Sequence, residues 1–487
     1  MSRKRWVVLA LALLMIGLAW VGVLGARSGL VVRQIARSDV PLIYLAPQNQ
    51  TRVPGVLIAH GFAGSKQLML GYGHVLAHAG YGVMLWDFSG HGGSTLPQRD
   101  SLQADLQVAY EALVAQPEID ATRLALLGHS MGSGSVMTAG IQQADRFAAT
   151  VAISPTGAKV TPESPRNLQL QAGSWEGGFI ANAERLLDRA GGENENLAAG
   201  QGRSLVLIPK AEHITILFRQ ASHQAALRWL DATFGRQNSS LYIDRRMAWY
   251  GLHLLGWLLA MGAILPSFAR SSPALSQISK FQVRSPIRRW GSLLVSALAA
   301  SGTIPLLGGG KNLAALGGVQ VGGAVALWFG IAGILWLGLL TQFPRPTLRA
   351  LLLGLSVFAL LWIGFGLMAQ LVWLQWWLIP TRLALWPWLA LGFLPWFLAS
   401  GMAQQDISGG SRIVWWLGQS IALVIGIFLM LQFSPQLGFL YILLPLFPLF
   451  MALFAYVAAL LNSTWGYALG CALFFGWAIA AAFPLAS

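Results

Sequence analysis

A serine between two glycines stands where a buried strand is expected to turn into a helix. The five residues are Gly128-His129-Ser130-Met131-Gly132, with the apolar run 123–127 before them and the small residues 133–141 after them. A turn this tight strains the serine backbone and requires neighbours without side chains. It also presents the hydroxyl above the edge of the sheet. The pattern therefore predicts that Ser130 is a nucleophile, with Gly128 and Gly132 as its structural neighbours.

A serine hydroxyl is a weak nucleophile and needs a general base, which is itself oriented by an acid. In sheets of this type the three residues follow the chain order serine, acid, histidine. His213 and His223 are the histidines between Ser130 and the apolar second half. His213 follows a predicted strand at 205–209, so we predict it as the base. His223 falls inside the next predicted helix and is expected at the surface or in packing.

The acid is expected where the strand at 167–172 ends. The glycine-rich loop 173–178 there contains one carboxylate, Glu176, which we predict as the partner of His213. Other carboxylates are weaker candidates because they lie in a helix, in a separate loop, or next to the base itself: Asp188, Glu193, Glu195 and Glu212.

Attack on an acyl carbon creates an oxyanion that needs two backbone N–H donors. The residue after the nucleophile, Met131, supplies one. The loop after the predicted strand 56–59 supplies the other, and Phe62 is its expected donor. Gly61 allows close approach of the backbone. His60 is predicted to fix this loop rather than to act as the base.

Alternating strands and helices are needed to bring these residues together. Before residue 235, apolar runs predict eight strands separated by helical patterns. This predicts an α/β fold, a mostly parallel sheet with helices on both faces. The predicted strands are 30–35, 42–45, 56–59, 81–86, 123–127, 149–154, 167–172 and 205–208, and the predicted helices are 66–79, 101–115, 133–143 and 214–234.

The second half of the chain has a different composition. Only 10% of the 487 residues are charged, whereas soluble proteins carry about 25%. Of the 32 basic and 18 acidic residues, 19 and 16 lie before Arg236, and 13 and 2 lie from Arg236 onward. The excess of cations therefore lies in the short loops between apolar spans, where the topology of a membrane protein explains it. We therefore expect no nucleic-acid partner. The single cysteine, Cys471, excludes an intrachain disulfide and a cysteine-based metal site.

Long uncharged runs predict about nine transmembrane helices. We expect an N-terminal membrane anchor at 1–26 (or a cleavable signal peptide), a hydrolytic domain at 27–235 and an all-α polytopic membrane domain of about eight helices at 236–487. The predicted spans are 6–24, 247–265, 290–307, 316–340, 350–370, 383–402, 413–433, 437–461 and 467–485.

Basic residues between these spans set the expected orientation. Arg270, Lys280, Arg284, Arg288 and Arg289 share one loop, and loops on that side are expected to face the cytoplasm. The N-terminus is then inside and the domain at 27–235 is outside a plasma membrane, although Arg236, Arg245 and Arg246 oppose this assignment.

Three segments together resemble the α/β-hydrolase superfamily. They are His60-Gly61, the run from Asp87 to Ser94 with sequence DFSGHGGS, and the serine pentapeptide. The similarity is to the serine-aminopeptidase, monoglyceride-lipase and dienelactone-hydrolase-like group, and it covers residues 53–235. The resemblance implies a Ser130–Glu176–His213 triad, with Asp87 and His91 as structural members of their loop. Glu176 departs from the commoner aspartate, and the segment 155–166 is too short for a substantial lid.

We therefore expect a membrane-bound serine esterase that acts on a small-molecule or lipid ester, and less readily on an amide. The alternatives are an acyltransferase to a lipid or envelope polymer, and a non-catalytic protein that binds or senses. Neither a metal nor a cofactor is expected, membrane lipids are expected partners, and the sequence predicts no oligomeric state. Because the lid segment is short, the membrane domain or the bilayer is expected to form the fourth wall of the site.

Overall fold

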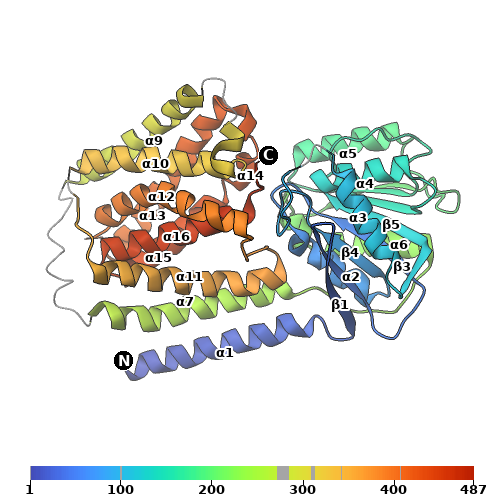
Figure 1. Cartoon of the computed structure of the whole chain (residues 1–487), viewed down its shortest axis with the longest axis horizontal. Helices are drawn as coiled ribbons and strands as arrows, with labels where there is room; N and C mark the ends of the chain where they lie inside the picture. Colours follow the sequence, from blue (N-terminus) through green and yellow to red (C-terminus); the bar gives the residue numbers. More distant parts are fainter. Residues whose placement is uncertain are drawn as a thin grey trace. The chain divides into compact units, whose positions relative to one another are not determined.

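The computed structural model describes residues 2–98, 101–270, 285–308, 313–341, 343–405 and 407–486. The chain forms two compact units (Figure 1). The sheet unit contains Leu18–Gly251 and also Met368–Ile379. The helical unit contains Met1–Gly17, Leu252–Leu367 and Pro380–Ala486.

The sheet unit contains an eight-stranded sheet with the order β1-β2-β4-β3-β5-β6-β7-β8 among the described residues. The pairs β1–β2 and β2–β4 are antiparallel, and every other neighbouring pair is parallel. The predicted mostly parallel sheet is thus confirmed. Its strands are β1 (Leu30–Arg37), β2 (Val40–Pro47), β3 (Val53–Ala59), β4 (Gly82–Trp86), β5 (Ile119–His129), β6 (Ala149–Ile153), β7 (Leu168–Gly173) and β8 (Arg203–Ile208).

Helices cover both faces of this sheet because its central strands are apolar on both sides. Val56 and Ile58 of β3 enter one core, and Leu57 and Ala59 enter the other. The first core is closed by α2 (Leu70–His78) and α6 (Gln220–Phe234). The second is closed by α3 (Gln103–Val114) and α4 (Met131–Gln142), and α5 (Gly177–Arg189) packs beside α4. Alternation of buried residues along each strand produces these two layers.

Seven of the described helices are long and apolar enough to cross a membrane. They are α1 (Arg3–Gly25), α7 (Arg246–Arg270), α10 (Gly322–Leu340), α11 (Leu348–Val372), α12 (Pro380–Ala403), α13 (Gly410–Gln432) and α16 (Thr464–Ala482). The predicted span 290–307 forms α9 (Pro286–Gly308), which is not among the seven and whose last side chains lie outside the described part.

The predicted span 437–461 is divided into shorter pieces. It contains α14 (Leu440–Leu443) and α15 (Leu446–Leu460), and Pro445 stands between them as the residue that precedes α15. Proline fits the start of a helix but breaks its interior, which explains the division. Among the charges used to predict orientation, Lys280 and Arg284 lie outside the described residues, so the inside and outside assignment stays a prediction.

Candidate active site

Ser130 lies in a strained turn between β5 and α4, which we call the elbow, and β5 is therefore the elbow strand. Its φ of 51° and ψ of −120° lie outside the ordinary regions for a residue with a side chain. A Cβ on Gly128 would lie 2.4 Å from the oxygen of Gly132, and a Cβ on Gly132 would lie 2.5 Å from the oxygen of His60. The two glycines are therefore required because strand, helix and neighbouring loop touch through their backbones.

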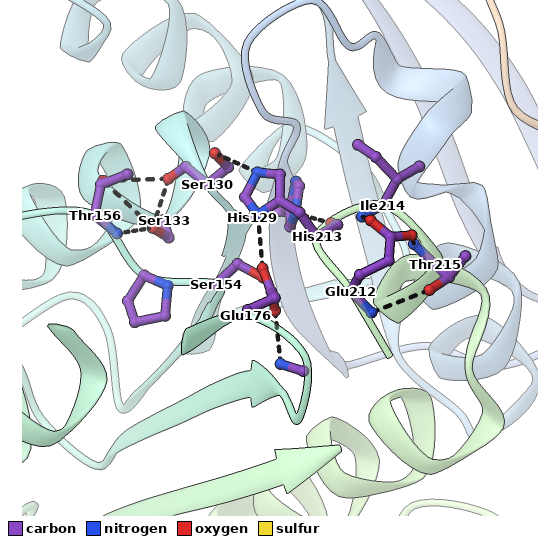
Figure 2. Close-up of polar contacts among 12 residues, drawn as sticks. His129, Ser130, Ser133, Ser154, Thr156, Glu176, Glu212, His213, Ile214 and Thr215 are labelled. Atoms are coloured by element: carbon purple, nitrogen blue, oxygen red, sulfur yellow. Dashed lines mark hydrogen bonds and ion pairs between the residues drawn. The ribbon is translucent and has the colours of Figure 1, made fainter. Parts of the chain in front are cut away.

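The structure brings Ser130, His213 and Glu176 into one hydrogen-bonded chain (Figure 2). The Nε2 atom of His213 lies 3.1 Å from Ser130 Oγ, and its Nδ1 atom lies 2.7 Å from Glu176 Oε1. A carboxylate only accepts, so Nδ1–H donates to Glu176 and Nε2 is left to accept the serine proton. Both distances are within reach of proton transfer.

The carboxylate of Glu176 is fixed on its second oxygen as well. Oε2 accepts the N–H of Gly173 at 2.6 Å and the hydroxyl of Ser154 at 2.9 Å. Glu176 is 6% exposed and lies directly before α5. Gly173 permits this crossing of loops, since a Cβ there would lie 2.4 Å from the oxygen of Ala211. The acid is thus held in one orientation at the ends of β6 and β7.

Two aromatic rings hold the imidazole of His213. Phe179 stacks on it with centroids 4.3 Å apart, and the His129 ring lies 4.7 Å away. His129 Nε2–H donates to the backbone oxygen of His213 at 3.0 Å. Burial, and then the charge on His213, lowers the pKa of His129 well below its ordinary value, so His129 acts as a neutral donor.

The two expected oxyanion donors come from α4 and from the loop after β3. Met131 is the first residue of α4, and the first N–H of a helix has no acceptor within that helix. Phe62 lies in the loop 60–65 between β3 and the short helix η1 (Lys66–Met69), which we call the oxyanion loop after its expected role. Gly61 brings that loop close, since a Cβ there would lie 3.1 Å from Ser130 Cβ.

His60 participates in the hydrogen bonds of this loop. Its Nε2 accepts the N–H of Phe88 at 3.1 Å, and its Nδ1–H therefore donates to the oxygen of Gly61 at 2.7 Å. Burial lowers the pKa of His60, which agrees with a neutral ring. The structure places His60 at the start of the oxyanion loop and not between Ser130 and a carboxylate.

Asp87 joins the oxyanion loop to the loop after β4. It accepts the backbone N–H groups of Lys66 at 2.7 Å and Gly93 at 2.8 Å, and its other contact is an ion pair with the Lys66 ammonium. Burial, the largest influence, raises the pKa of Asp87, but the charge of Lys66 and the hydrogen bonds from Lys66, with a further contribution from His60, together outweigh it, and the net pKa is lowered. His91 donates Nδ1–H to the oxygen of Ser89 at 3.0 Å, and its ring contacts Phe62 with centroids 5.7 Å apart.

Several residues of the site were not predicted from the sequence. They are Lys66, His129, Ser133, Ser154, Thr156 and Phe179. Ser154 carried a usable signal, because it ends the strand next to the elbow strand, where carboxyl ends of parallel strands converge. Nothing in the sequence indicated that Lys66 belongs to the site, because a lysine at the start of a predicted helix is common at a protein surface.

The other candidates are not brought to Ser130. Glu212 accepts the backbone N–H groups of Ile214 and Thr215, and Glu193 accepts that of Leu205. His223 is buried and bonds the oxygen of Leu217. Among the described residues no group of three His, Cys, Asp or Glu side chains is arranged to hold a metal ion.

Comparison with known proteins places the similarity in the sheet unit. Residues 52–196 match the sequence model of the serine aminopeptidase family. An uncharacterised protein of Mycobacterium tuberculosis is 33% identical over 91 residues, which is 18% of this chain and 32% of that protein. Cutinase 2 of Thermobifida cellulosilytica is 31% identical over 113 residues, 22% of this chain and 41% of the cutinase. The match thus spans less than half of either relative.

A solved dienelactone hydrolase from Anabaena variabilis has 20% sequence identity and a TM-score of 0.32. The alignment covers 41% of this chain and 97% of that one. The strand order and parallel register described above, together with the match at 52–196, give the N-terminal region an α/β-hydrolase fold, and this region is similar to the serine aminopeptidase family.

Proposed function

We propose that this protein is a membrane-bound serine hydrolase that cleaves carboxylic esters through an acyl-enzyme. The observation that carries the proposal is the hydrogen-bonded chain from Ser130 through His213 to Glu176. It supplies a nucleophile, a base and an orienting acid, the three groups that acyl transfer requires.

In the acylation step, Ser130 Oγ attacks the acyl carbon while His213 Nε2 takes its proton. Glu176 stabilises the imidazolium that results and keeps Nδ1 as the donor. The N–H groups of Met131 and Phe62 bind the oxyanion, and collapse of the tetrahedral intermediate expels the alcohol, which receives the proton from His213. Water then repeats the sequence on the acyl-enzyme, and His213 first accepts and then returns the proton.

Similarity to a cutinase favours esters over amides as substrates. Seven apolar helices support a location at a membrane, and the basic residues between the expected spans favour the outer face of the plasma membrane for the hydrolase domain. We infer a lipid ester as the substrate class, because an apolar ester partitions into a bilayer.

The proposal is tested with the purified full-length protein and p-nitrophenyl esters of two, eight and sixteen carbons. We expect hydrolysis of at least one ester, lost in Ser130→Ala and preserved in Ser239→Ala, which removes the hydroxyl of an exposed serine in the same unit. Equal rates for wild type and Ser130→Ala would contradict it.

A further inference from the structure

A segment from between two apolar helices belongs to the sheet unit. Met368–Ile379 includes the last turn of α11 and the connection to α12, and it groups with the sheet rather than with the helices around it. In the described part of the chain, α7, α9, α10 and α11 lie between the sheet and this segment.

Gln375 is the residue of this segment that contacts the machinery around the oxyanion loop. Its Oε1 accepts the amide N–H of Gln67 at 2.6 Å. Gln67 is 2% exposed and directly follows Lys66, the residue at which Asp87 fastens the end of the oxyanion loop. A hydrogen bond to a buried amide is costly to remove, because the abandoned group finds no water.

Gln375 also lies close to Gly93, the second residue whose backbone N–H donates to Asp87. A Cβ built on Gly93 would lie 3.7 Å from the amide carbon of Gln375, and Gly93 N–H donates to Asp87. Gln375 therefore lies against both of the segments that Asp87 joins. The segment at Lys66 leads back to Phe62, and the segment at Gly93 contains His91, whose ring contacts Phe62.

Gln375 is itself held in place by its own segment. Its Oε1 also accepts from Gln370 Nε2 at 3.2 Å, and its Nε2–H donates to the oxygen of Trp377 at 2.9 Å. Gln370 Oε1 in turn accepts the backbone N–H groups of Trp376 and Trp377 at 2.6 and 3.1 Å. A side chain fixed at both ends can transmit the position of its segment to Gln67.

We propose that Gln375 is a positioning residue for the oxyanion loop, so that the connection between α11 and α12 sets how well the Phe62 N–H is placed. The proposal rests on the proposed function, and it names the part of the apolar half that acts on the hydrolase site. In this account Gln375 touches no substrate and acts through Gln67 and Gly93.

The test uses the full-length protein in lipid nanodiscs with Gln375→Met, Gln375→Glu and Gln432→Ala, and with Gln67→Ala alone and combined with Gln375→Met. Gln375→Met keeps the length of the side chain and removes its hydrogen bonds, and Gln375→Glu keeps the acceptor for Gln67. Gln432→Ala is the matched control, an exposed glutamine of α13 whose amide bonds Tyr441. Each variant is assayed for kcat and KM, for inhibition by an alkyl trifluoromethyl ketone, and for hydrogen exchange of the peptide 60–69.

We expect kcat of Gln375→Met to fall about 10-fold with KM within about 2-fold, because the oxyanion is stabilised in the transition state and not in bound substrate. Affinity for the ketone, whose adduct carries an oxyanion, should fall in parallel. Gln375→Glu should retain most of the activity, and Gln67→Ala should add little further loss in the Gln375→Met background, since both changes break the same contact.

Exchange of 60–69 should rise in Gln375→Met and stay at the wild-type level in Gln432→Ala. Unchanged exchange, or a Gln375→Met enzyme with wild-type kcat and ketone affinity, would overturn the inference while leaving the hydrolase intact. Equal activity of wild type and Ser130→Ala would instead remove the proposed function, and the exchange measurement would still decide whether Gln375 orders the loop.

Discussion

The sheet unit and the helical unit differ in the partners that their buried polar side chains have. In the sheet unit, two buried pairs of opposite charge are Lys66 with Asp87 and Arg246 with Asp244. In the helical unit, the buried Arg382 of α12 donates to the backbone oxygens of Ala480 and Phe483, and a second buried cluster on α12, α13 and α16 is uncharged. Ser400 bonds Gln404 and Gln419, and its hydroxyl lies 3.4 Å from that of Tyr467. In these examples the sheet unit pairs opposite charges, whereas the helical unit satisfies its buried polar groups with hydroxyls, amides and backbone oxygens.

The two units also differ in how many large apolar side chains they expose. Large exposed apolar side chains are frequent along the long helices, including Leu14, Leu352, Ile421 and Leu449, whereas few lie on the sheet unit. Extended apolar surfaces of this kind mark contact with membrane or partner. Four changes test the comparison, three in the sheet unit and one in the helical unit, from the largest expected effect to the smallest.

Replacing Glu176, the predicted acid, should cause the largest loss of activity. Glu176→Gln keeps the shape but no longer fixes the tautomer of His213, so kcat should fall by about 10³- to 10⁴-fold. Glu195→Gln, a carboxylate exposed on the surface, is the control and should keep wild-type rates. Steady-state hydrolysis of an activated ester measures both, and equal losses in the two variants would show that Glu176 has no special role.

Filling the elbow should cost stability. A Cβ at Gly132 would lie 2.5 Å from one backbone oxygen and 2.7 Å from another, so Gly132→Ala must separate α4 from the loop after β3. We expect a loss of about 3 kcal/mol in the free energy of unfolding. Gly178→Ala meets nothing within 4 Å and should be neutral or nearly so. Comparable unfolding midpoints for the two variants would refute the close approach.

Acid should destabilise the sheet unit through buried histidines. Burial, together with the charge of Arg246 and against that of Asp244, lowers the pKa of His74 to about 3, and the pKa of His223 is also lowered by burial. Between about pH 6.5 and 3 the unfolded chain binds more protons at His74, so stability falls as pH falls through this window.

His74 should contribute a slope of about 1.4 kcal/mol per pH unit below pH 6.5. Thermal unfolding at pH 7.5, 6.0 and 5.0 measures the slope, and His74→Gln should make it shallower. A slope that is identical in His74→Gln and wild type would mean that His74 is not buried in its neutral form.

The smallest effect is expected in the helical unit. Ser400→Ala removes the hydroxyl that joins Gln404 and Gln419, and hydrogen bonds between membrane helices contribute on average only about 0.6 kcal/mol. The unfolding midpoint in detergent should fall slightly, and ester hydrolysis should be unchanged. A large loss of activity in Ser400→Ala would show that this network serves the hydrolase site.

The sequence was most informative where a backbone constraint selects the residue type. The spacing of Gly128 and Gly132 predicts a turn that only glycine permits. The alternating apolar runs predict the strands that precede Ser130, Glu176 and His213. Contacts between distant segments leave no such pattern. Lys66 with Asp87, and Gln375 with Gln67, are common polar residues whose partners lie 21 and 308 positions away. The helix break at Pro445 was visible as a proline but was outweighed by the hydropathy around it.

The account depends most directly on Ser130 being an activated nucleophile. Incubation of the full-length protein with a fluorophosphonate probe, followed by mass spectrometry of the peptide that contains the elbow, measures this without knowledge of the substrate. We predict one adduct on Ser130, no labelling in Ser130→Ala, and slower labelling in Glu176→Gln. Labelling of wild type and Ser130→Ala to the same extent, or none in either, would contradict the account.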